Sequence, residues 1–107
     1  MSARRVVTTT RADEDIDGAV EFLVGSGARD SATEFVDALR FARNLISNYP
    51  HIGSTRLAIE LRLPELRTLA LREVPYLLCY TNDADAVRIH RVLHSRRDIM
   101  TDLQELI

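Results

Sequence analysis

Apolar residues recur with two different periods in the two halves of this 107-residue sequence. Between residues 10 and 46 they return every three or four positions, as on the buried stripe of a helix. Between residues 67 and 93 they alternate with polar residues or form one short continuous run, as in strands. We therefore predict one α+β domain over residues 1–107, because a chain of this length holds one modest core.

A strand followed by a helix is predicted at the start of the chain. Arg4–Thr10 is rich in β-branched residues, which favour strands. Thr10, with Asp13 three positions later, resembles a capping box, so we expect Thr10 to be the N-cap of the helix. Gly25 and Gly27 are expected to end this helix.

A second helix is predicted from Asp30 or Ser31 to the Asn48-Tyr49-Pro50 segment. Ser31 and Glu34 form another capping-box pattern, and apolar residues follow at helical spacing for about four turns. Because the link between the two helices is short, they are expected to form an antiparallel hairpin.

The second half predicts three strands and a short C-terminal helical segment. The strands, joined by short turns, should form an antiparallel meander. The first strand of the chain cannot join them through a tight turn, so we expect it beside the last strand, with parallel pairing as one option. The result is a mainly antiparallel four-stranded sheet with the hairpin packed on one face. The expected segments are Arg67–Arg72, Pro75–Thr81, Val87–Leu93 and the helical Ile99–Ile107, with His51–Pro64 as an edge strand or a packed loop.

Charge is unevenly distributed along the chain. The formal net charge of −2 gives no bulk attraction to nucleic acid or to anionic membranes. All fourteen basic residues are arginines, whose forked guanidinium suits carboxylate and phosphate partners. Acids crowd residues 13–21, whereas residues 88–97 hold four arginines, two histidines and no acid. We therefore expect a local basic patch along the last strand.

The sequence favours a cytoplasmic protein without a membrane span. It has one cysteine, which excludes an intramolecular disulfide, whereas small secreted domains often carry several. No apolar run approaches the roughly 20 residues that cross a bilayer, and the N-terminus does not resemble a signal peptide.

No pattern of a cofactor or metal site is visible. His90 and His94 would lie about 13 Å apart on a strand, which excludes a shared metal ion. Cys79 falls in the most apolar strand and is expected to be a buried thiol. Arg91 interrupts the alternation of the last strand, so it is either paired with an acid at the sheet rim or held on an open face for a partner.

Several segments, in order, resemble the ParE branch of the ParE/RelE toxin superfamily. "RVLHSRRDI" at residues 91–99 is similar to the family's "rvlHgrRDi", and "PYLLCY" at 75–80 to its "pYrilY", with a departure at Leu77. "NYPHIG" at 48–53 resembles its "NP-x-x-G", and Leu66-Arg67 the start of its second strand. Residues 12–16 resemble its "A-x-x-D-l" stretch.

The resemblance implies a toxin of a type II toxin–antitoxin system that binds DNA gyrase and is not an enzyme. A ParD-type antitoxin would neutralise it in a hetero-oligomer, and the toxin alone would not bind nucleic acid directly. Two alternatives stay open: a RelE-type ribosome-dependent mRNA endoribonuclease, and a non-toxic module that binds its antitoxin in operon autoregulation. Few groups match the RelE catalytic set, since Leu77 replaces an arginine and no aromatic residue follows Tyr80.

Candidate residues for binding the target or the antitoxin fall into two groups. The charged and polar group is expected to contact the target or the antitoxin, with antitoxin acids lying against Arg88, Arg91, Arg96 and Arg97. A local ion pair between Arg97 and Asp98 is the alternative for those two residues. The apolar group, with Val24, lies off the main helical stripes and is expected to form a groove for an amphipathic antitoxin helix. The alternative is that its two phenylalanines close the hairpin against each other. The candidates are Arg67, Arg91, His94, Arg96, Arg97, Asp98, Phe22 and Phe41.

Overall fold

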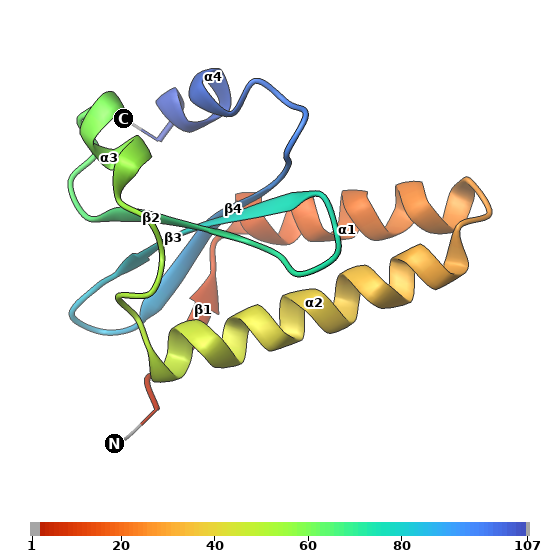
Figure 1. Cartoon of the computed structure of the whole chain (residues 1–107), viewed down its shortest axis with the longest axis horizontal. Helices are drawn as coiled ribbons and strands as arrows, with labels where there is room; N and C mark the ends of the chain where they lie inside the picture. Colours follow the sequence, from red (N-terminus) through yellow and green to blue (C-terminus); the bar gives the residue numbers. More distant parts are fainter. Residues whose placement is uncertain (1–2, 107) are drawn as a thin grey trace.

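A four-stranded sheet separates a long helical hairpin from two short helices in the computed structural model, which describes residues 3–106 (Figure 1). The α+β class and the hairpin on one sheet face are therefore confirmed. The elements are β1 (Val6–Thr8), α1 (Thr10–Gly25), α2 (Arg29–Asn48), α3 (Arg56–Leu61), β2 (Leu66–Ala70), β3 (Tyr76–Asn82), β4 (Val87–His94) and α4 (Ile99–Gln104).

The strands lie in the order β1-β4-β3-β2, so the first strand is beside the last, as expected. β1 runs parallel to β4 over three residue pairs, from Val6 beside Val87 to Thr8 beside Ile89. The other neighbours are antiparallel. β1 is shorter than the predicted strand and leaves the second half of β4 without a strand on that side.

The first helix is capped by Thr9, so the prediction that Thr10 is the N-cap is wrong by one residue. Thr9 has an extended backbone, and its hydroxyl accepts a hydrogen bond from the Ala12 N–H at 3.1 Å. The same hydroxyl donates to the His90 carbonyl at 3.1 Å. Thr9 therefore links the helix start to β4, a tertiary constraint that a local capping pattern does not contain.

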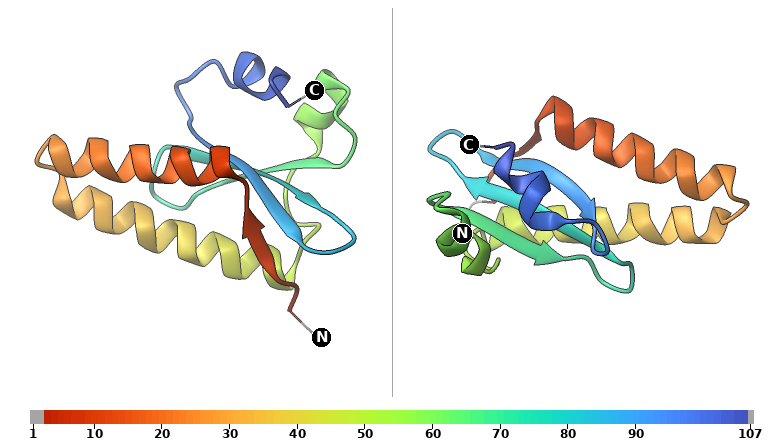
Figure 2. Two further views of the ribbon diagram at one scale, coloured as in Figure 1. Left: turned by 180° about the vertical axis from the view of Figure 1, so that it is seen from behind. Right: turned by 90° about the horizontal axis from the view of Figure 1, so that it is seen from above.

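The second helix begins at Arg29, earlier than the predicted Asp30 or Ser31. Ala28 precedes it without a side-chain cap. Its N–H instead bonds to the Leu23 carbonyl of α1 at 2.9 Å, and Gly27 takes a φ of +82° that favours glycine. Backbone bonds of the tight link thus replace the capping box expected at Ser31. Figure 2 shows that this link projects beyond the sheet.

Residues 51–64 contain helix α3, so the expectation of an edge strand or loop there is wrong. Only Ser54 forms an isolated antiparallel bridge, to Thr68 of β2. The rest turns over the sheet as α3, which buries Ala58 and Leu61 while Ile59 stays 77% exposed. The alternation of Ile59, Leu61 and Leu63 with charged residues has the two-residue period typical of a strand, although residues 56–61 are helical.

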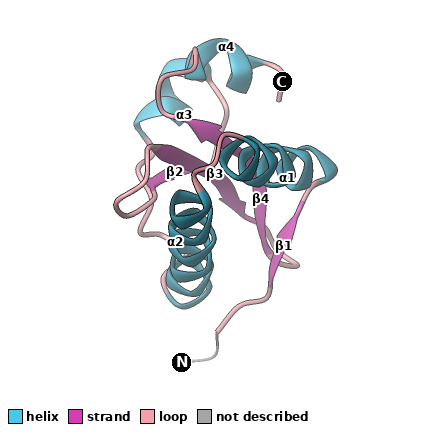
Figure 3. Ribbon diagram, turned by 90° about the vertical axis from the view of Figure 1, so that its right-hand side faces the viewer, coloured by secondary structure: helices cyan, strands magenta, loops and turns pink. Residues whose placement is uncertain are grey.

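The hairpin and the pair of short helices lie on opposite faces of the sheet (Figure 3), and an apolar cluster lies under each of them. The first packs the hairpin against the sheet and includes Phe35, Ile46, Leu78 and Tyr80. The second packs α3 and α4 on the other face, around residues that include Leu103, which is fully buried. The second face is therefore covered by the chain itself. Within residues 3–106 no helix is long and apolar enough to cross a membrane.

Candidate functional site

A bulge in β4 decides where Arg91 points. Arg91 lies opposite Cys79, but Ile89 lies opposite Tyr80, so His90 is an extra residue in β4. The bulge keeps Ile89 in the hairpin core and turns Arg91 toward the face covered by α3 and α4. Without a bulge, the alternation of the strand would place Arg91 on the same face as Val87 and Ile89, and the bulge separates it from them.

Arg91 is buried and paired with Asp15 of α1. Its Nε and Nη2 donate to the two Asp15 carboxylate oxygens at 2.8 and 3.1 Å, and its side chain is 3% exposed. The Asp15 hydrogen bond raises the pKa of Arg91 further. Of the two alternatives left open by the sequence, the structure shows the arginine paired with an acid.

The Asp15 carboxylate also satisfies a backbone N–H group of β4 beyond the end of β1. Its Oδ2 accepts the Val92 N–H at 3.0 Å, a bond that a longer β1 would otherwise make. The remaining Arg91 nitrogen, Nη1, is buried without a hydrogen bond and lies 3.9 Å from Glu105, the residue that follows α4. The Arg91 side chain in β4 therefore interacts with acids of α1 and of the C-terminal end of α4.

An open groove of about 440 Å³ runs between α1 and the end of β4. We call it the α1/β4 groove. Gly18 leaves space in its wall, since no atom lies within 4 Å of where its Cβ would be. Phe22 borders it and is 69% exposed. The groove brings together three of the predicted binding residues, Phe22, His94 and Arg97.

The segment after β4 is ordered by its own side chains. The His94 Nδ1 accepts the Arg96 N–H at 3.1 Å, and its ring lies edge-on to Tyr76 at 5.1 Å. Arg97 pairs with Asp102 at 2.9 Å, so the expected pair between Arg97 and Asp98 is absent from the described residues.

Asp98 instead caps helix α4. Its carboxylate accepts the Thr101 hydroxyl at 2.6 Å and the Thr101 N–H at 3.1 Å. These two bonds lower the pKa of Asp98. Arg96 differs from its neighbours, because its side chain makes no hydrogen bond or ion pair within residues 3–106.

The predicted basic patch along β4 is largely neutralised. Arg88 pairs with Asp83 and Asp85 of the β3–β4 turn, and Arg91 is paired as described. The Arg91 partner, Asp15, is distant in the sequence, whereas the two acids that pair with Arg88 lie in the adjacent turn. Of the four arginines between residues 88 and 97, Arg96 is the one with an unpaired guanidinium in the described chain.

Phe41 lies in a hollow separate from the α1/β4 groove. It is 47% exposed, lines a hollow with Glu34 and Glu73, and holds the Arg72 guanidinium 4.8 Å above its ring. In the antiparallel hairpin, Phe22 lies in the last turn of α1, beside the link, whereas Phe41 lies about three turns into α2. The two rings therefore do not close the hairpin against each other, and each remains available at the surface.

Arg67 is occupied in holding the loop after α2. Its Nη1 donates to the carbonyls of His51 and Gly53 at 2.9 and 3.0 Å. The Tyr80 hydroxyl accepts the Gly53 N–H and donates to the Pro50 carbonyl, both at 2.9 Å. No sequence pattern indicated this role of Tyr80, which is also fully buried in the cluster beneath the hairpin.

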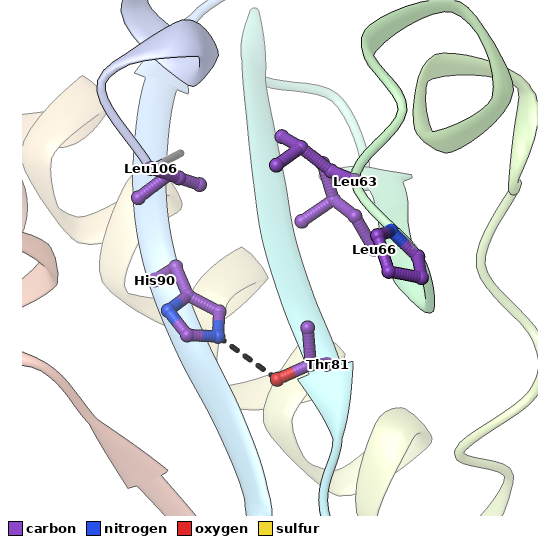
Figure 4. Close-up of a pocket in the computed structure, with 6 residues that line it drawn as sticks. Leu63, Leu66, Thr81, His90 and Leu106 are labelled. Atoms are coloured by element: carbon purple, nitrogen blue, oxygen red, sulfur yellow. Dashed lines mark hydrogen bonds between the residues drawn. The ribbon is translucent and has the colours of Figure 1, made fainter.

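A small hollow of about 190 Å³ lies over His90 between α3 and α4 (Figure 4). Leucines form its walls, and the His90 ring bonds to the Thr81 hydroxyl at 2.8 Å at its base. Burial lowers the pKa of His90. The volume is below the roughly 300 Å³ typical of small-molecule sites. Beside it, burial raises the pKa of Cys79 to about 12, which makes the thiol unreactive.

The family model described as "ParE toxin of type II toxin-antitoxin system, parDE" matches residues 6–99. The chain belongs to the ParE toxin family. This confirms the resemblance drawn from the sequence segments. A search of curated proteins found no match to this chain.

Among solved structures, the ParE-type fold described here is similar to that of a chain described as "Chromosomal ParDE TA system from P. aeruginosa". The TM-score is 0.69 at 17% sequence identity, over 86% of this chain and 96% of that chain. At this identity the similarity establishes the fold.

Proposed function

We propose that this ParE-family toxin inhibits DNA gyrase by binding it and is neutralised by a ParD-type antitoxin. The observation that carries the proposal is the family match, which extends over residues 6–99. Such a function places the protein in the cytoplasm with gyrase, and it requires a binding surface rather than a catalytic centre.

The intramolecular pairing of the arginines supports binding over catalysis. Cleavage of RNA needs a base, an acid and a cation that are free to meet the phosphate. Here Arg91 is buried against Asp15, Arg97 is paired with Asp102, and Arg67 holds loop carbonyls. A ribosome-dependent nuclease would depend on His94 and Arg96 alone at this end of the sheet.

For the antitoxin we propose two anchor points, Phe22 in the α1/β4 groove and Phe41 in its hollow. Both are exposed aromatic rings beside charged groups, an arrangement that suits the apolar face of an amphipathic segment. Arg96 offers a free cation for the acids of such a segment.

Replacing either ring with glutamate should weaken antitoxin binding at least about tenfold, because a charge would enter the apolar contact. The measurement is the Kd of Phe22→Glu and Phe41→Glu for the ParD-type antitoxin by calorimetry. Ile59→Glu is the matched control, since Ile59 is 77% exposed on α3. Thermal unfolding of the free variants should match the wild type, and unchanged Kd values would remove these anchors.

The function itself is tested with two assays in parallel. The purified toxin should inhibit gyrase supercoiling, the antitoxin should restore it, and ribosome-bound mRNA should stay intact. Cleaved mRNA with unaffected supercoiling would overturn the proposal in favour of a RelE-type activity. Normal growth during expression without antitoxin would favour a non-toxic antitoxin-binding module.

A further inference from the structure

The loop after α2, residues 49–53, exposes apolar side chains although its backbone is firmly held. We call it the exit loop. Tyr49 is 57% exposed and Ile52 is 47% exposed, and with Pro50 they line an open hollow of about 520 Å³. It is thus an apolar surface distinct from the α1/β4 groove and from the Phe41 hollow.

The exit loop is fixed from inside the molecule. Tyr80 bonds to both Gly53 and Pro50, and Arg67 bonds to the carbonyls of His51 and Gly53. A Cβ at Gly53 would lie 2.8 Å from the Tyr80 hydroxyl, so the loop packs directly on that ring. A surface held in one conformation loses little entropy on binding, which is what a contact site requires.

The sequence on both sides of the exit loop carries charges of one sign. From residue 38 to residue 59 the chain contains three arginines and one histidine but no acid. Arg67 adds a further positive charge directly beneath the loop. The acids of the β3–β4 turn, Asp83 and Asp85, are paired with Arg88. An apolar surface with Arg67 beneath it and no acid in the adjoining sequence is complementary to an apolar recess bordered by carboxylates.

We propose that the exit loop is the surface with which this toxin contacts its target, and that the contacted site is an acidic protein surface with an apolar recess. This inference rests on the proposed function and adds that the toxin binds its antitoxin and its target through separate surfaces. The antitoxin occupies the hairpin side through Phe22 and Phe41, while Tyr49 and Ile52 enter the target.

The test uses gyrase as the probe and substitutes Ile52 in two ways. Ile52→Glu places a negative charge against an acidic partner, so half-inhibition of supercoiling should need at least about tenfold more protein. Ile52→Lys loses the same apolar contact but keeps the favourable sign, so it should lose clearly less. Both variants should bind the antitoxin within about twofold of the wild type, because Ile52 is far from both anchors in the proposed complex.

One control separates this inference from general surface effects. Ile59→Glu introduces the same charge at an exposed isoleucine on α3 and should inhibit like the wild type. Equal inhibition by Ile52→Glu and the wild type, or an equal loss in Ile59→Glu, would overturn the exit loop as the target surface.

Failure of the proposed function would look different. A wild-type protein that leaves gyrase active would overturn the proposed function. The exit-loop inference is then tested by growth arrest, in which Ile52→Glu should be weakest, Ile52→Lys intermediate, and Ile59→Glu equal to the wild type. Equal arrest by all variants would overturn the exit-loop inference alone, and a wild type without either effect would overturn both. Wild-type cleavage of mRNA that Ile52→Glu abolishes would place RNA on the loop and contradict an acidic protein partner.

Discussion

Asp15 has two structural roles through one carboxylate. It neutralises the buried Arg91 and accepts the Val92 N–H at the point where β1 ends. Removing one partner of a buried ion pair leaves the other charge desolvated, which typically costs about 3–5 kcal/mol. For this reason Asp15 contributes more to stability than its position on a helix surface suggests.

Asp15→Ala should therefore lower the free energy of unfolding by about 3–5 kcal/mol. Urea unfolding monitored by circular dichroism measures it. The neighbouring Glu14, which is exposed, provides the control, and Glu14→Ala should change stability by less than about 0.5 kcal/mol. A loss in Asp15→Ala no larger than in Glu14→Ala would contradict the role assigned to the pair.

His90 makes stability depend on pH. Burial lowers its pKa in the folded chain, so the unfolded chain binds this proton more readily. Its contribution is fully present above the ordinary pKa of about 6.5 and is lost as the pH falls through the lowered folded value. The nearby Asp83 acts against this shift and Arg88 acts with it.

His90→Gln should reduce the loss of unfolding free energy between pH 7.5 and pH 5, because glutamine does not titrate there. Unfolding in urea at both pH values gives the comparison. His51→Gln, which makes the same substitution at an exposed position of the exit loop, is the matched control. An identical pH dependence in His90→Gln and the wild type would show that His90 is not the group responsible.

At the scale of elements, Gly53 and Tyr80 join the exit loop to the sheet. A Cβ at Gly53 would meet the Tyr80 hydroxyl at 2.8 Å and the Arg67 Cβ at 2.9 Å, closer than real contacts. Gly18, in contrast, has no atom within 4 Å of such a Cβ and lies inside α1. The same substitution is thus expected to have opposite effects at the two glycines.

Gly53→Ala should destabilise the fold by about 1–3 kcal/mol through overpacking. Gly18→Ala should stabilise it by about 0.5–1 kcal/mol, because alanine favours a helix interior. Melting temperatures under one set of conditions are sufficient to compare them. Shifts of the same sign would contradict the close contact between the exit loop and Tyr80.

The sequence predicted most elements but not the contacts between distant ones. The apolar run at 75–80 and the alternation at 87–93 are local signals, and both strands form. The bulge at His90 depends on register with β3, and the pairing of Arg91 with Asp15 joins positions 76 residues apart. Such contacts are set by tertiary packing, which a single sequence pattern does not contain.

Only part of the candidate site was predictable, because helix patterns indicate exposed residues but do not indicate ion pairs between distant elements. Phe22 and Phe41 departed from the buried stripes of their helices, and both are exposed. The arginines of β4 were visible as a cluster, but their acidic partners come from α1, α4 and the β3–β4 turn. That Arg96 keeps an unpaired guanidinium could therefore be recognised only from the three-dimensional arrangement of those elements.

At the scale of the whole molecule, the central claim is that the toxin acts as a stoichiometric ligand. Both sheet faces are covered by the chain, and the arginines closest to a nuclease arrangement are engaged internally. The proposed function therefore relies on surfaces that bind, and an inhibitor of this kind acts once per target molecule.

The most direct test is gyrase supercoiling activity measured against the molar ratio of toxin to gyrase. Inhibition should saturate only when the toxin concentration reaches or exceeds the gyrase concentration, and added antitoxin should restore supercoiling. Loss of target function at ratios far below one, with cleaved mRNA accumulating over time, would show turnover and contradict the central claim.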